Sequence, residues 1–215
     1  MKKSSDNRNY LYNNNSVTRR VEFSVIEKNV GKNNKIIDLG CGDGSLMQIL
    51  SKNGNSCQGM EISQSGVDVC KKRGLNVVKG RIDTKLSFGN KKFDVAVCNV
   101  TIQMVMYPEI LLAEMKRISK KQIITFPNFG FILNRIELIF YGVFPKWSIF
   151  GYGWYSTGHI HQLSIRDFIV YCKENNLKIL KAEHVGPGGL IGILLKPVVE
   201  IFPNLFATMA IFVTE

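Results

Sequence analysis

The sequence predicts an α/β fold in which a mostly parallel sheet is covered by helices on both faces. Between residues 35 and 126, short apolar runs of strand length alternate with segments whose apolar residues recur at helical spacing. Parallel neighbours need a crossover connection, and this alternation supplies one at each step. In addition, 45% of the 215 residues are hydrophobic, which is enough for one sizeable core.

The elements of this sheet are delimited by glycine and by changes of period. Gly31, Gly54 and Gly74 each follow an apolar helical segment, and glycine readily takes the backbone conformation that ends a helix. The expected helices cover residues 17–29, 45–52, 65–73 and 108–119, and the expected strands cover residues 35–39, 56–62, 75–78, 93–98 and 122–126.

The pattern changes after the fifth strand, where residues 127–160 form an aromatic, loop-rich insert. Aromatic side chains suit a lid over a ligand pocket and a protein interface equally well, so both interpretations stay open. Within the insert, we expect Phe140 and Phe144 to pack in the core.

The C-terminal part carries one more helix and two late strands. Ser164 and Asp167 have the spacing of a capping box, which predicts a helix over residues 164–174. The late strands are expected at 177–185 and 205–213, with a turn and a connecting segment between them, in a single domain over 17–215 that follows a flexible arm over 1–16.

The chain is basic, because 28 Lys and Arg residues against 17 Asp and Glu residues give a net charge of +11. Residues 1–121 carry +10 and residues 122–215 carry +1. Such a balance raises nucleic acid as a partner. However, the sequence contains no RNA-binding module or base-flipping signature, and runs such as Lys71-Lys72-Arg73 are expected at solvated helix ends. We therefore expect no nucleic-acid partner.

Cysteine usage and hydropathy indicate a cytoplasmic protein without a membrane partner. The five cysteines are scattered and include no CxxC pair, so we expect neither a disulfide framework nor a metal site. The polar N-terminus lacks the apolar run of a secretory signal. The apolar stretches 129–144 and 190–213 are interrupted by charged residues, and the second also by proline, so neither predicts a membrane span.

A glycine-rich loop follows the first strand, where residues 38–44 read Asp-Leu-Gly-Cys-Gly-Asp-Gly. Ligands of open α/β sheets bind at this edge, and glycine lets the backbone approach them, although a tight turn alone would also need glycine. The spacing matches neither the dinucleotide fingerprint nor the P-loop. Carboxylates at Asp38 and Asp43 suit a cationic ligand, and S-adenosylmethionine carries a sulfonium and an ammonium group.

Glu61 ends the second strand, about 20 positions beyond the loop. A carboxylate at such a position can accept hydrogen bonds from ribose hydroxyls. An ordinary exposed strand-end carboxylate is the alternative interpretation. Together with the loop, Glu61 predicts a ligand that contains a nucleoside.

Several segments carry a resemblance to a known family. Residues 37–46 read Ile-Asp-Leu-Gly-Cys-Gly-Asp-Gly-Ser-Leu, and residues 125–130 read Thr-Phe-Pro-Asn-Phe-Gly. Further along are Trp154-Tyr155, His-Ile-His at 159–161 and Ile-Arg-Asp-Phe at 165–168. The first segment resembles the class I S-adenosylmethionine-dependent methyltransferases in general. The others make the chain, from about Gly31 to its end, similar to the MetW family of methionine biosynthesis proteins.

The resemblance implies a Rossmann-like class I methyltransferase fold, with a seven-stranded, mostly parallel sheet whose last strand is inserted antiparallel. It also implies S-adenosylmethionine or S-adenosylhomocysteine as the cofactor. Asp38 would fix the loop or the ammonium group, Glu61 would hold the ribose hydroxyls, and Ile62 would lie against adenine. The other implied cofactor contacts are Gly40, Cys41, Gly42 and Gly44 along the methionyl part, and Asn99 and Val100 over the cofactor.

One position departs from the pattern of these enzymes. After the third strand many of them have Gly-Asp, whose carboxylate accepts the adenine amino proton, whereas residues 80–83 here read Gly-Arg-Ile-Asp. Arginine has no acceptor. Adenine is then held by the backbone at Ile82, by Asp83, or less firmly, and we count Arg81 and Ile82 among the cofactor-binding candidates.

No segment identifies a catalytic base. Methyl transfer is an in-line displacement at an activated carbon, so alignment and electrostatics can supply much of the catalysis. Residues 99–102 lack the Asn/Asp-Pro-Pro-aromatic pattern of enzymes that methylate nucleic-acid bases, and Cys98 is expected in the core. His161 is the candidate catalytic residue, whereas His159 fits a helix cap or a loop contact. The candidate substrate-binding residues are Trp154, Tyr155 and His161.

The leading hypothesis is a methyltransferase that acts on a small molecule and is linked to methionine biosynthesis. The alternative, implied by the resemblance, is a non-catalytic S-adenosylmethionine-binding partner or regulator of homoserine O-acyltransferase, with the insert as its docking surface. An RNA methyltransferase is suggested only by the net charge.

Overall fold

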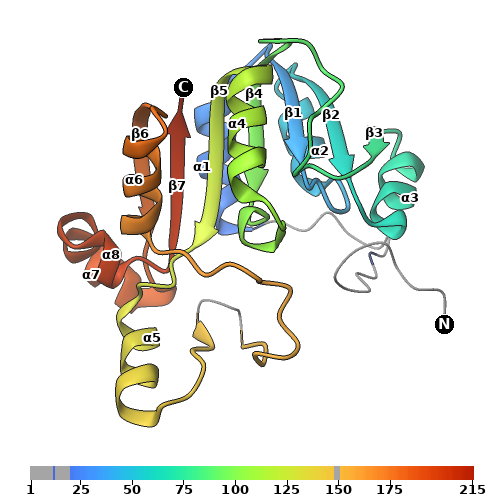
Figure 1. Ribbon diagram of the computed structural model, residues 1–215. Helices are drawn as coiled ribbons and strands as arrows, with labels where there is room; N and C mark the ends of the chain where they lie inside the picture. Colours follow the sequence, from blue (N-terminus) through green and yellow to red (C-terminus); the bar gives the residue numbers. More distant parts are fainter. Residues whose placement is uncertain (1–11, 13–19, 148–150) are drawn as a thin grey trace.

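The computed structural model describes residue 12, residues 20–147 and residues 151–215 (Figure 1). Apart from Tyr12, the arm expected over residues 1–16 lies outside the described residues, as do residues 17–19 of the first expected helix. The described chain forms a seven-stranded sheet in the order β3-β2-β1-β4-β5-β7-β6. Its strands are β1 (Lys35–Leu39), β2 (Ser56–Glu61), β3 (Asn76–Lys79), β4 (Phe93–Asn99), β5 (Ser119–Pro127), β6 (Ile179–Val185) and β7 (Met209–Thr214).

The strand directions confirm the predicted fold class. Strands β1 to β5 pair in parallel, and β7 lies antiparallel between β5 and β6. The chain winds from β1 outward to β3 and then returns to β4 on the other side of β1. The carboxyl ends of β1 and β4 are therefore the topological switch point at which ligands of such sheets bind.

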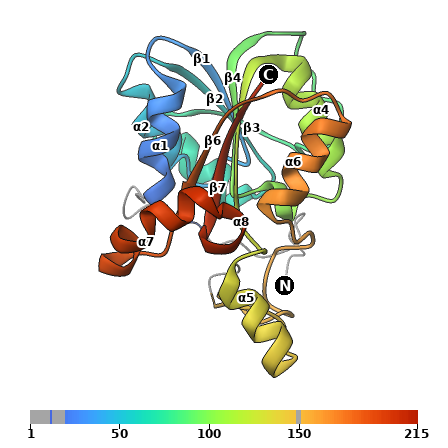
Figure 2. The ribbon, with the colours of Figure 1, turned by 90° about the vertical axis from the view of Figure 1, so that its left-hand side faces the viewer.

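Helices cover both faces of the sheet, as Figure 2 shows edge-on. On one face, α1 and α2 bury Phe23, Ile26 and Leu50, and on the other, α4 and α6 bury Leu111 and Phe168. The helices of these layers are α1 (Val21–Val30), α2 (Ser45–Ser51), α3 (Gln64–Lys72), α4 (Pro108–Ile118) and α6 (Ile165–Glu174).

The start of α6 confirms the predicted capping box. The Ser164 hydroxyl accepts the Asp167 N–H, and the Asp167 carboxylate in turn accepts the Ser164 N–H at 2.8 Å. Two orphan donors of the first helical turn are satisfied in this way. The residues that follow therefore enter the helix directly, and Ile165 and Phe168 point into the core.

The insert contains more regular structure than its sequence predicts. Its first part forms the short helix α5 (Ile132–Ile136), which continues into the π-helical turn η2 (Glu137–Tyr141). Figures 1 and 2 show this segment projecting beyond the carboxyl ends of the parallel strands. Phe144 is half-buried and packs on Phe129 outside the main core, with ring centroids 6.2 Å apart, and Phe140 is 76% exposed. The expectation that Phe140 packs in the core is wrong, because the projecting segment has no sheet face beneath it.

The connection between β6 and β7 is helical rather than a turn. Helix α7 (Gly189–Ile201) and the short helix α8 (Pro203–Phe206) fill it, so β7 starts later than the expected residue 205. Helix α7 contains Pro197, which removes a helical hydrogen bond, and apart from Lys196 and Glu200 it consists of apolar residues and glycine. A segment of this kind carries no clear helical period, which explains the missed helix.

Candidate functional site

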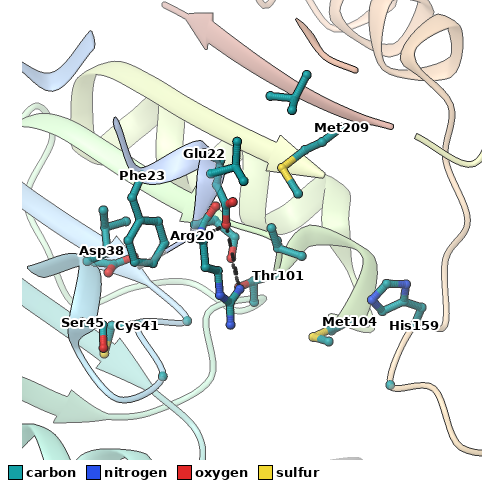
Figure 3. A pocket seen from close by; sticks show the side chains of 18 of the residues that line it. Arg20, Glu22, Phe23, Asp38, Cys41, Ser45, Thr101, Met104, His159 and Met209 are labelled. Atoms are coloured by element: carbon teal, nitrogen blue, oxygen red, sulfur yellow. Dashed lines mark hydrogen bonds and ion pairs between the residues drawn. The ribbon is translucent and has the colours of Figure 1, made fainter. Parts of the chain in front are cut away.

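A cavity of about 1200 Å³ opens at the carboxyl ends of β1, β2 and β4. These ends carry Asp38, Glu61 and Asn99, and the cavity also reaches residues of the insert and of the β6–β7 connection. Figure 3 shows Asp38 and Cys41 toward one side of the view and Met209, Met104 and His159 toward the other. The cavity thus has a side formed by the glycine loop and a side formed by the two late insertions.

The glycine loop is held against the sheet by its own backbone. The N–H groups of Gly40 and Cys41 both donate to the Met60 carbonyl, at 2.8 and 3.2 Å. Gly40 has a φ of +81°, and a Cβ at this position would lie 2.5 Å from the Cγ2 of Thr101. A side chain is therefore excluded both by backbone conformation and by space. The cradle that results fits close approach of a ligand to the backbone.

Glu61 fixes the far side of the same loop. Its carboxylate accepts the N–H of Gly42 and the N–H of Ser63, each at 2.8 Å, and the residue is buried. Each carboxylate oxygen has a second lone pair, so Glu61 can still accept from a ligand hydroxyl. Gly44 plays a different part, since it starts α2 next to Leu75 and does not line the cavity.

Asp38 is a buried carboxyl group on the cavity wall. The pKa of Asp38 is raised from 3.8 to about 7, mainly by burial and in addition by the nearby carboxylates of Glu61 and Asp43. Each of these causes disfavours the ionised carboxylate. A ligand with a positive charge beside Asp38 would offset them, so the electrostatics of this wall favour a cation.

Asp43 has a local partner and is not simply a ligand group. Its carboxylate lies 3.3 Å from the Arg73 guanidinium, and it accepts the N–H and the hydroxyl of Ser45 at 3.0 and 2.8 Å. Arg73 also donates to the Asp43 carbonyl at 2.8 Å. The expectation that Arg73 is a solvated helix-end cation is therefore wrong, because it closes the loop onto α3.

Arg81 lies on the cavity wall with its guanidinium paired to Asp83. The pair is bidentate, with Nε to Oδ1 at 3.1 Å and Nη2 to Oδ2 at 2.8 Å. The buried Asp83 carboxylate also accepts the N–H groups of Met106 and Tyr107, at 2.9 and 3.3 Å. Most of its accepting capacity is thus used within the protein, while Ile82 lies buried beside it on the same wall.

Val100 holds a strained position between the two sides of the cavity. Its φ of +51° is unusual for a β-branched residue. Its N–H donates to the carbonyl and the hydroxyl of Thr125, at 3.1 and 3.0 Å, and Thr125 also donates to the Asn99 side chain. Strain of this kind persists where the surroundings fix the backbone, and it clusters at ligand sites.

Glu22 is a wall residue that sequence reasoning missed. It comes from α1, is 2% exposed, and accepts the Asn99 amide N–H at 3.3 Å. In the view of Figure 3 it lies with Arg20 between Asp38 and Met209. An acidic residue in the first turn of a helix ordinarily faces solvent, so only the packing of α1 reveals it.

The sulfur- and glycine-rich side of the cavity was also missed. Its methionines come from η1 (Ile102–Met104), from the residues after it, and from β7. No local motif brings these segments together, because they meet only in the folded sheet. Other residues that line the cavity and were not predicted are Thr101, Met104, Met106, Tyr152, Gly186, Gly189, Gly192, Lys196 and Met209.

The structure separates the candidate acceptor residues. His159 lines the cavity, with its Nε2 3.4 Å from the Gln103 amide. His161 is exposed, contacts the Met106 carbonyl at 3.3 Å and does not line the cavity. Trp154 and Tyr155 form an edge-to-face pair and are 72% and 79% exposed, away from the cavity wall.

Cys98 behaves as a core residue. Cys98 is fully buried, as expected, and burial raises its pKa to about 12. A thiol with such a pKa stays protonated and is a poor nucleophile. Among the side chains of the described ranges, no group of three or more His, Cys, Asp or Glu could hold a metal ion. None of the helices in the same ranges is long and apolar enough to cross a bilayer.

Comparisons with known proteins place the chain among relatives of known family and fold. A family model described as methionine biosynthesis protein MetW matches residues 20–214. A relative in Rhodopirellula baltica, named bifunctional methionine biosynthesis protein MetXA/MetW, is 28% identical over 152 residues. That match covers 66% of this chain but only 24% of the relative, so the chain corresponds to a minor part of the longer protein.

Several solved structures with the same fold are described as S-adenosylmethionine-dependent methyltransferases. One from Thermotoga maritima, described as a possible histamine N-methyltransferase, has a TM-score of 0.62 and 17% identity over 90% of this chain and 86% of that one. One from Mesorhizobium loti has a TM-score of 0.63 and 13% identity over 93% of this chain and 99% of that one. At these identities the likeness establishes the fold alone.

Proposed function

The chain belongs to the MetW family of methionine biosynthesis proteins, and we propose that it binds S-adenosylmethionine in the cavity and transfers its methyl group to a small molecule. The observation that carries the proposal is the pair of buried carboxylates, Asp38 and Glu61, on either side of a glycine cradle. A cationic amino acid joined to a nucleoside matches both groups. A cytoplasmic location is part of the proposal.

Each wall residue would have a distinct task. S-adenosylmethionine supplies an electrophilic methyl group on a sulfonium. Asp38 would pair with its ammonium group, and the cradle at Gly40 would lie against its methionyl part. Glu61 would accept hydrogen bonds from its ribose hydroxyls. Glu22 and His159 lie on the wall beyond the cradle, within the same cavity, where an acceptor would be oriented. Alignment of this kind can supply much of the rate of a displacement.

The cofactor assignment predicts saturable binding of S-adenosylhomocysteine in isothermal titration calorimetry. We expect Glu61→Gln to weaken this binding by on the order of 10-fold or more, because a neutral amide accepts ribose hydroxyls less well and disturbs the Gly42 contact. Asp68→Asn is the matched control, since Asp68 is an acid on α3 that contacts the exposed Gln64 side chain. Absence of saturable binding to a folded sample would refute the assignment.

A second candidate is a non-catalytic partner of homoserine O-acyltransferase that senses S-adenosylmethionine. The relative whose name joins MetXA to MetW in one chain favours it, because fused proteins often act together. In this candidate the exposed Trp154–Tyr155 pair is the docking surface, since aromatic side chains dominate interface energetics.

The second candidate predicts co-elution of the chain with the acyltransferase from the same cell, and a change in acyltransferase activity on mixing. Trp154→Ala should weaken co-elution by on the order of 10-fold or more, because a large exposed indole is lost from the contact. Ile169→Ala, which truncates an exposed side chain on α6, should leave it unchanged. Separate elution of the two native proteins would count against this candidate without affecting cofactor binding.

A further inference from the structure

The tip of the insert, residues 135–147, carries a group of exposed apolar side chains. Helix α5 and η2 run together to Gly142, whose φ of +59° ends the helix. Within this tip Ile139, Phe140 and Tyr141 are 73%, 76% and 72% exposed. The other exposed apolar side chains of the tip are Ile136, Leu138, Val143 and Trp147. Figures 1 and 2 show that the tip stands clear of the sheet and its covering helices.

The exposed side chains surround the helix instead of lining one face. Leu138 to Tyr141 are four consecutive residues, and four residues pass around about one helical turn. A helix that docks in a protein groove presents anchors at helical spacing along one side, with polar residues opposite. A turn that is apolar on all sides is stable only where apolar surroundings enclose it, as the core of a protein or a bilayer does.

The composition around the tip fits a lipid surface. Residues 128–165 contain one carboxylate, Glu137, against the cations Arg135 and Lys146. The Glu137 carboxylate accepts the Lys146 N–H at 2.8 Å, so it is already engaged within the tip. Tyr141 and Trp147 are of the aromatic types that favour the boundary between acyl chains and headgroups. The net charge of the tip, +1, has the sign that anionic lipid attracts.

We propose that the insert tip docks on the surface of a bilayer that contains anionic lipid, with Leu138 to Tyr141 inserted among the headgroups and upper acyl chains. The contact is interfacial, which agrees with the lack of any membrane-spanning helix within the described ranges. It departs from the sequence expectation of no membrane partner, which considered spanning segments only. The proposal does not rest on cofactor binding, because the tip lies outside the cavity wall.

The test uses the full chain and vesicles of phosphatidylcholine alone or with about 30% phosphatidylglycerol. We expect co-sedimentation with the anionic vesicles, weaker binding to the neutral ones, and a decrease as salt is raised. Ile139→Ser/Phe140→Ser should reduce the bound fraction by on the order of 10-fold or more, since two large apolar side chains no longer leave water. Ile169→Ser, an exposed apolar site on α6, is the matched control.

A spectroscopic readout locates the contact at the tip. The chain has two tryptophans, so Trp154→Phe leaves Trp147 as the only one. Its emission should shift to shorter wavelength on anionic vesicles and be quenched by brominated acyl chains. Circular dichroism and S-adenosylhomocysteine binding are measured on every variant. A variant that keeps both but no longer binds vesicles has lost only the membrane contact of the tip.

Three outcomes would overturn the proposal. The first is no vesicle binding at low salt by a folded sample. The second is equal binding by the wild type and the Ile139→Ser/Phe140→Ser variant. The third is a chain that binds no vesicles but uses the tip to associate with itself or to co-elute with the acyltransferase. The tip would then dock on a protein and not on a bilayer.

Discussion

Gly40→Ala should abolish measurable binding of S-adenosylhomocysteine, with a loss of affinity of roughly 100-fold or more. The added Cβ would lie 2.5 Å from the Cγ2 and 2.8 Å from the Oγ1 of Thr101. Either the loop or Thr101 must then move, and a shift of about 1 Å at a site of this kind can cost about 100-fold. Titration calorimetry on the folded variant gives the affinity directly.

The same substitution should also lower the free energy of unfolding. An L residue at a φ of +81° costs about 1–2 kcal/mol, and overpacking costs about another 1–3 kcal/mol. Gly74→Ala is the matched control, because Gly74 has a similar φ of +71° but no atom within 4 Å of the added Cβ. In urea denaturation, Gly74→Ala should lose only the free energy that the backbone conformation costs, about 1–2 kcal/mol. It should bind S-adenosylhomocysteine as tightly as the wild type.

A double variant separates the clash from the backbone strain. Gly40→Ala/Thr101→Gly removes every Thr101 atom that the new Cβ would meet, so stability should recover in part relative to Gly40→Ala. If Gly40→Ala binds as tightly as the wild type, the cradle is not the cofactor site. If it is no less stable than Gly74→Ala, the loop is looser than its contacts indicate.

The sheet could be predicted because each strand is marked by its own short stretch of sequence. Residues 35–39 and 93–98 are short apolar runs next to recognisable turns, and they form β1 and β4 with almost the same bounds. Parallel strands that are buried on both faces need such runs regardless of their neighbours. Helix α7 and the α5–η2 segment gave no such signal, because their apolar residues do not keep to one face.

The candidate site divides in the same way. Asp38 and Glu61 lie at the carboxyl ends of predicted strands and Gly40 directly follows one, so topology alone brings them to one edge of the sheet. Glu22 and Met209 come from the first helix and the last strand, and only the packing of α1 and the pairing of β7 with β5 place them on the wall. Sequence spacing contains no information about such meetings between distant segments.

Asp38→Asn should remove the pH dependence of cofactor binding. With a pKa of about 7 in the free protein, Asp38 is about one tenth ionised at pH 6 and mostly ionised at pH 8. The ammonium group of the ligand pairs with the ionised form, so the affinity of the wild type for S-adenosylhomocysteine should rise about 10-fold over this range. The variant should bind about equally weakly at both values.

Proton release gives an independent measure of the same coupling. If Asp38 ionises when the ligand enters, titration at pH 6 in buffers of different ionisation enthalpy should show about 1 proton released per ligand bound, and near zero at pH 8. Asp38→Asn should show no release at pH 6. Affinity that does not change with pH in the wild type would mean that Asp38 does not pair with the ligand.

The stability of the ligand-free protein should fall as pH rises, whereas the affinity for the ligand should rise. The pKa of Asp38 in the folded protein, about 7, lies above its unfolded value of 3.8. The contribution of Asp38 to the free energy of unfolding is therefore fully present below pH 3.8 and is lost as pH rises through about 7. The loss is at most about 4 kcal/mol above pH 7.

Asp38→Asn carries no charge to bury, so at pH 8 it should have a higher Tm than the wild type while losing the cofactor. A variant that is less stable at pH 8 and still binds would show that Asp38 supports the fold instead of the ligand. The buried carboxylate therefore makes the free protein less stable at neutral pH, and a bound cation would return that stability.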